Sequence, residues 1–124
     1  MPIDLPNFNP GNVDELVDAI TGEISELGKK WWSTNSAIVE GYIKSLAEAT
    51  LQTQIALQTR DIKPDQADRI MHMQELAFTS TLHFTKYMTF VLAQRVLDTT
   101  FTIVGWAFFN RTGVNIFPQL VKPS

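Results

Sequence analysis

The feature that most constrains this chain is a long segment in which no residue is expected to end a helix. Between Asp65 and Phe109 the sequence holds no proline, and its only glycine is Gly105. A continuous helix over this segment would be roughly 65 to 70 Å long, at about 1.5 Å per residue. A compact domain of 124 residues has a diameter of only about 35 Å. The helix therefore either breaks, with the break expected around residues 78–81, or projects from the domain and is covered by another molecule.

Two shorter helices are predicted before this segment. Asn12 is suited to cap a helix because Glu15 follows at the third helical position, and apolar residues then recur at helical spacing. Gly28, with the two lysines that follow it, is typical of a helix end. A second helix is expected to start at Ser33 or Thr34. We predict an all-α fold of three helices, at about 13–28, 34–60 and 65–109.

Charge divides the chain into two unlike parts. The residues up to Glu75 carry 12 acids and 6 bases, whereas the 49 residues after it carry one acid, four bases and seven of the eight phenylalanines. The net charge of −3 argues against a general nucleic-acid-binding protein, which needs an excess of lysine and arginine. We predict one helical domain, 1–124, made of an extended leader at 1–11, an acidic helical pair at 12–62, a long apolar helix at 64–110 and an extended tail at 111–124.

The last part of the long helix is apolar around most of its circumference. One face is interpreted as assembly-facing or lipid-facing, and it consists of Phe90, Leu97, Phe101, Val104 and Phe108. The opposite face carries a narrow polar stripe of Arg95, Asp98 and Thr102. Arg95 and Asp98 are three residues apart, a spacing that allows a charge-assisted contact on a helix.

Three interpretations of this helix stay open. It lies at a subunit interface with Arg95 and Asp98 paired, or in a membrane with that pair facing the protein interior, or on the surface of an ordinary monomeric bundle. Its longest uncharged stretch, Thr99 to Asn110, has 12 residues, fewer than the roughly 18 of a simple transmembrane helix. Tryptophans beside basic residues are typical of membrane interfaces, although tryptophans at a helix junction also cap cores. The expected interfacial anchors are Trp31, Trp32 and Trp106.

Motifs for catalysis and metal binding are sparse. The chain has no cysteine, which excludes disulfides, thiolate zinc sites and cysteine nucleophiles. Its two histidines, His72 and His83, are eleven residues apart, and His72 with Glu75 lacks the Glu-x-x-His spacing of di-iron bundles. No phosphate-binding glycine loop, nucleophile elbow or dinucleotide fingerprint occurs in the sequence. We therefore expect no enzyme activity, no cofactor and no metal site.

These patterns predict a non-catalytic, self-assembling helical structural subunit that is associated with a membrane or inserted in it. By architecture alone, a component of a virion, a channel or a tube-like assembly is expected. The expected partners are copies of the chain itself and a lipid bilayer or another structural protein, but no nucleic acid. The alternative is a soluble helical protein-binding module whose third helix docks a partner protein.

The first ten residues bear on localisation. Met1 to Pro10 has neither the basic region nor the apolar run of a secretory signal. We therefore expect synthesis in the cytoplasm, followed by association with a membrane or a particle.

Overall fold

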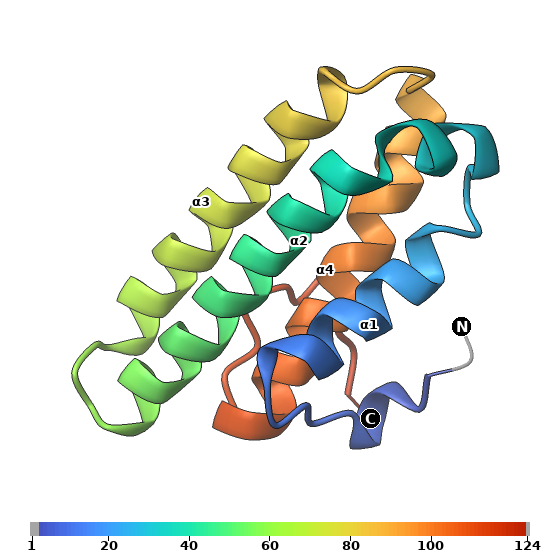
Figure 1. The fold of residues 1–124 in the computed structure, drawn as a ribbon. Coiled ribbons are helices and arrows are strands. Elements are labelled where there is room, and N and C mark those ends of the chain that lie inside the picture. Colours follow the sequence, from blue (N-terminus) through green and yellow to red (C-terminus); the bar gives the residue numbers. More distant parts are fainter. Residues whose placement is uncertain (1–2, 124) are drawn as a thin grey trace.

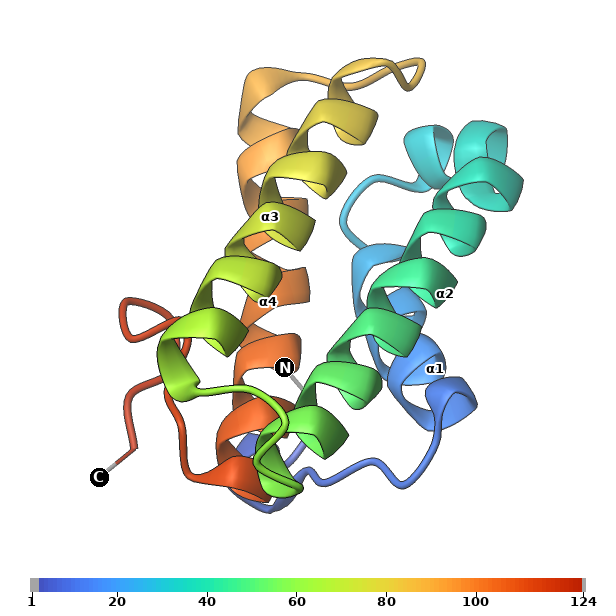
Figure 2. The same cartoon turned by 90° about the vertical axis from the view of Figure 1, so that its left-hand side faces the viewer.

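The fold is a bundle in which two helices are central and two are lateral. The computed structural model describes residues 3–123, which form four α-helices, one short 3-10 helix and no strand. α2 and α4 each pack against all the other α-helices, whereas α1 and α3 lie on opposite sides of them (Figures 1 and 2). The all-α class is confirmed, with four helices in place of three. Their bounds are η1 Leu5–Asn7, α1 Val13–Ile24, α2 Lys29–Gln58, α3 Pro64–His83 and α4 Phe90–Thr112.

The prediction of one long helix at 65–109 is wrong, because the chain turns back at residues 84–89. This turn lies beyond the 78–81 region in which a break was expected. α4 starts with its own N-cap, since the Thr89 hydroxyl accepts a hydrogen bond from the Leu92 N–H at 3.1 Å. Tyr87 adopts a positive φ of 62° within the turn. The turn brings α3 back along α4, so the apolar face of α4 is covered by its own chain.

The core lies between the helices and takes up most of this apolar face. Phe101 of α4 is fully buried. Its ring centroid lies 6.1 Å from that of Phe78 on α3 and 5.2 Å from that of Phe117 in the C-terminal tail. Aromatic rings at such separations attract each other, and this attraction adds to the stabilisation that comes from burying their apolar surface. The core therefore joins α3, α4 and the tail.

The junction between α1 and α2 also differs from expectation. α2 begins at Lys29, five residues before the predicted start at Thr34. Bases in the first turn oppose the helix macrodipole, but this cost is offset by burial of Trp31 in the same turn. A Cβ atom on Gly28 would lie 2.8 Å from Leu92 Cδ2, so a larger residue here would force the Leu92 side chain to shift. The glycine thus lets the α1–α2 junction pack closely against α4.

The predicted cap at Asn12 is confirmed. The Asn12 side chain accepts a hydrogen bond from the Glu15 N–H at 2.9 Å, and the Glu15 carboxylate accepts one from the Gly11 N–H at 2.7 Å. Both contacts are local, which explains why the start of α1 is predictable from a few residues of sequence.

The leader and the tail both pack on α4. Asn110 Nδ2 donates to the backbone oxygens of Leu5 and Phe8, at 2.8 Å each. In the tail, Phe117 and Val121 are buried over Gly105, where a Cβ atom would lie 2.6 Å from Val121 Cγ2. The two terminal segments therefore complete the bundle.

Candidate functional site

Exposed apolar side chains gather where α3 turns into α4. The exposed fractions are 88% for Phe84, 55% for Tyr87, 81% for Phe90 and 67% for Val91. We call these four residues the aromatic end. It lies at the same end of the molecule as the first turn of α2, and away from the 3-10 helix η1 and the end of α4 (Figure 1).

Hydrogen bonds from α2 fix the turn that carries the aromatic end. Asn35 is buried, and its Nδ2 donates to the backbone oxygen of Lys86 at 2.8 Å, while its Oδ1 accepts from the Lys86 N–H at 3.2 Å. Trp31 Nε1 donates to Thr85 Oγ1 at 2.8 Å. These contacts join residues more than 50 positions apart in the sequence. The exposed rings are therefore presented on a turn of defined conformation.

The same end of the molecule is basic. The segments that build it, residues 28–36 and 80–97, hold Lys29, Lys30, Lys86 and Arg95 but no Asp or Glu, and one acid from the adjoining chain, Glu26, lies beside them with its Oε2 3.9 Å from Lys29 Nζ. All other residues together carry six bases and thirteen acids, a net charge of −7. Lys30 Nζ lies 4.3 Å from the centroid of the Tyr87 ring, a cation–π geometry. The chain is thus strongly polarised between a basic, apolar end and an acidic remainder.

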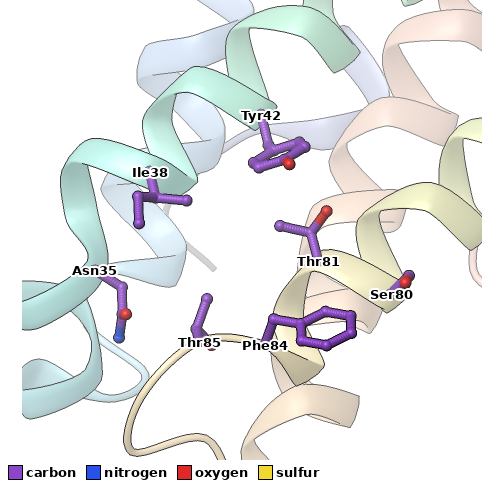
Figure 3. Close-up of a pocket in the computed structure, with 7 residues that line it drawn as sticks. All are labelled: Asn35, Ile38, Tyr42, Ser80, Thr81, Phe84 and Thr85. Atoms are coloured by element: carbon purple, nitrogen blue, oxygen red, sulfur yellow. The ribbon is translucent and has the colours of Figure 1, made fainter.

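A groove lies beside the aromatic end, between α2 and α3 (Figure 3). Its volume is ≈ 380 Å³. Ile38 and Tyr42 of α2 point toward Thr81 across the groove, and both are about half exposed or more, at 60% and 48%. We call this the α2–α3 groove, and its lining residues are Asn35, Ile38, Tyr42, Ser80, Thr81, Phe84 and Thr85.

The face expected to contact lipid or other subunits is mostly inside the bundle. Phe101, Val104 and Phe108 are fully buried, and Leu97 is half-buried. Phe90 alone of the five is exposed. Beyond the first turn of α4 this face is covered within the chain, since Phe78 of α3 and Phe117 of the tail pack against Phe101. The accessible part of that face is therefore Phe90 at the start of α4.

The polar stripe lies on the surface. Arg95 and Asp98 are both exposed, and none of the ion pairs found among residues 3–123 joins them. Asp98 Oδ1 instead accepts a hydrogen bond from Gln94 Nε2 at 2.9 Å. Thr102 is half-buried, and its hydroxyl donates to the Asp98 backbone oxygen at 2.5 Å. The stripe therefore faces water in the isolated chain and is not a buried pair.

The three tryptophans occupy different environments. Trp31 belongs to the core, with 1% of its surface exposed. Trp32 is half-buried, with its ring centroid 6.0 Å from that of Trp31. Trp106 is half-buried beside Phe109 on the half of α4 away from the aromatic end. Of the three expected anchors, Trp32 is the one that combines partial exposure with a position at the basic end.

His72 has a structural position between α3 and the tail. Its Nε2 lies 3.1 Å from the Ile116 backbone oxygen, its Nδ1 lies 3.2 Å from Glu75 Oε1, and its ring packs against Phe117. Among residues 3–123, no group of three or more His, Asp or Glu side chains is placed to hold a metal ion. The arrangement around His72 therefore fixes the tail to α3.

Sequence reasoning missed Phe84, Tyr87 and Val91 as surface residues, because it assigned them to the interior of a long helix. Thr89 was the available signal. Threonine is a favoured N-cap, and an apolar run follows it. The hydrogen bonds of Asn35 to the turn have no signature in the sequence around Asn35.

None of the helices within the described residues is both long enough and apolar enough to cross a membrane.

Comparison of the chain with protein-family models, with curated protein sequences and with solved structures gave no match. A functional proposal therefore has to rest on the surface and the fold described above.

Proposed function

We propose that this chain is a non-catalytic structural subunit that joins a larger assembly through its aromatic end. The observation that carries the proposal is the exposure of Phe84 and Tyr87 on one fixed turn, together with Phe90 and Val91 at the start of α4 directly after it. Exposed apolar side chains that gather in one place mark an interaction surface, whereas scattered ones need no explanation. Covering a large apolar side chain contributes about 1.5 to 3 kcal/mol when its burial is complete.

The fixed turn strengthens the proposal. Association normally costs about 0.5 to 1.5 kcal/mol for each flexible side chain that becomes ordered at an interface. Here the backbone of the turn is already held by Asn35 and Trp31. More of the free energy from covering the rings is therefore available for binding.

Fractionation of the cells that make the protein tests this proposal. The variant Phe84→Ser/Phe90→Ser removes both rings from the aromatic end. The matched control, Met73→Ser/Leu76→Ser, removes two apolar side chains of α3 that are 68% and 69% exposed. We expect the native chain and the control to sediment with membranes or large particles and the double phenylalanine variant to remain in the supernatant. If that variant sediments like the native chain, the aromatic end is not the attachment surface.

The α2–α3 groove favours a second candidate function, a helical module that binds a partner protein. A groove of ≈ 380 Å³ that has Ile38, Tyr42 and Phe84 among its lining residues can take an apolar side chain from an amphipathic helix. Ile38→Ser alters this groove but leaves the rings of the turn in place. Protein binding in the groove predicts that Ile38→Ser releases the chain into the supernatant as fully as Phe84→Ser/Phe90→Ser does. Attachment through the aromatic end alone predicts that it does not.

A further inference from the structure

We infer that the aromatic end binds the surface of an anionic phospholipid bilayer. The inference rests on the proposed function and names the partner of the same surface. That partner must offer two things side by side, an apolar layer for Phe84, Phe90 and Val91 and negative charge for Lys29 and Lys86. The interface of an anionic bilayer offers both, because phosphate headgroups lie directly over acyl chains.

The charge distribution selects this orientation. A chain with a net charge of −3 is repelled by an anionic surface unless its basic end approaches first. α3 has 20 residues and is therefore about 30 Å long, which is more than three Debye lengths at physiological salt. Acids at the opposite end of the bundle are thus screened when the aromatic end is in contact, whereas Glu26 stays beside Lys29 at this end. Each lysine near such a surface raises the affinity about fivefold.

The side chains at this end suit the interface between water and lipid. The Phe84 and Phe90 rings have no polar atom and are more than 80% exposed. Tyr87 and the half-buried Trp32 each have a polar group on an aromatic ring, the chemistry enriched at bilayer interfaces. Lys86 lies within the same turn, and a lysine can extend its ammonium group to the headgroups while its stem lies in apolar surroundings.

A second copy of the chain does not satisfy both requirements. The acidic groove between α1 and α2, lined in part by Asp14, Asp18 and Glu40, complements the charge of the aromatic end. The lining of this groove, however, has only two apolar side chains, Val17 and Ala37, and both are smaller than the phenylalanine rings that they would have to cover. Contact between two aromatic ends would cover the rings but would bring bases against bases. A bilayer meets both demands without either conflict.

Vesicle co-sedimentation of the purified full chain tests the inference. The vesicles consist of phosphatidylcholine alone or of phosphatidylcholine with about one-third phosphatidylglycerol, which supplies the anionic headgroups. We expect the native chain to bind the anionic vesicles at least about tenfold more tightly than the neutral ones. Phe84→Ser/Phe90→Ser should lower the affinity for anionic vesicles by about 100-fold, or about tenfold for each ring.

Lysine variants test the electrostatic part. Lys29→Gln/Lys86→Gln leaves the contact between Lys30 and Tyr87 intact and should lower binding to anionic vesicles about 30-fold, that is about 1 kcal/mol for each lysine. The matched control is Lys44→Gln/Lys122→Gln, which neutralises two exposed lysines outside the basic end and should change binding no more than about twofold. The control Met73→Ser/Leu76→Ser should behave in the same way. Circular dichroism and thermal unfolding confirm that each variant is folded.

Three outcomes would overturn the inference. They are no binding of the native chain to either vesicle, equal binding to both vesicles, and equal loss in the two lysine double variants. If vesicles are not bound but Phe84→Ser/Phe90→Ser still releases the chain in cell fractionation, the partner is a protein, and the proposed function stands without the lipid. If that variant changes neither measurement, both proposals fail.

Discussion

Replacement of Asn35 by alanine should destabilise the turn between α3 and α4, and the structure gives the magnitude. The Asn35 side chain makes two hydrogen bonds with the Lys86 backbone, at 2.8 and 3.2 Å. Each such bond contributes about 0.5 to 1.5 kcal/mol net. Lys86 is exposed, so in the variant its backbone N–H and C=O form hydrogen bonds with water in place of some of those lost to Asn35. The loss from the two bonds is therefore about 2 kcal/mol.

A neighbouring threonine supplies the control. Alanine is a better helix former than either asparagine or threonine. Thr34→Ala and Asn35→Ala therefore gain a similar amount of helix propensity. Among residues 3–123, the Thr34 hydroxyl bonds to the Lys30 backbone oxygen within α2 and makes no hydrogen bond to the turn. Urea unfolding followed by circular dichroism should place Asn35→Ala about 2 kcal/mol below Thr34→Ala in stability. A difference under about 0.5 kcal/mol would show that Asn35 does not hold the turn.

The remaining predictions concern the core and the polar stripe, and denaturant or thermal unfolding measures each of them. Phe101→Ala should cost about 3 to 5 kcal/mol, because the ring is fully buried, whereas Phe90→Ala on the same helix should cost less than about 0.5 kcal/mol; equal costs would contradict the placement of α4. Asp98→Ala should also cost less than about 0.5 kcal/mol, since Asp98 is exposed and hydrogen-bonded to Gln94. A loss of several kcal/mol in stability would instead show that Asp98 forms a buried ion pair with Arg95. Gln54→Leu should stabilise the fold by about 1 to 2 kcal/mol, because the amide is buried and neither of its polar atoms has a partner within residues 3–123; a lower melting temperature would refute this.

Local chemistry made part of the fold predictable. Asn12 caps α1 through a contact with a residue three positions away, and Pro64 is the first residue of α3, as its fixed φ favours. The apolar periodicity of α4 also identified the face that carries Phe101 and Phe108. Each of these features depends on residues close together in the sequence or on one helical repeat.

The turn at 84–89 could not be placed from the sequence, because it depends on distant residues. Neither proline nor glycine marks it, and its hydrogen bonds come from Trp31 and Asn35 on α2. The length estimate did require that a single helix should break or project, but it carried no information on where. The position of this turn decides which part of the apolar face is accessible. Because the sequence did not reveal the turn, it did not reveal the aromatic end either.

The most direct test of the aromatic end as the docking surface is the depth of two single-site labels in anionic vesicles. The chain has no cysteine, so Val91→Cys and Gln58→Cys each provide one site for an environment-sensitive fluorophore. Val91 belongs to the aromatic end, and Gln58 is the last residue of α2, at the opposite end of the bundle (Figure 1). We predict that lipids with a quencher in the acyl region quench the label at position 91 and leave the label at position 58 unquenched. Equal quenching at both positions, or quenching at position 58 alone, would contradict docking through the aromatic end.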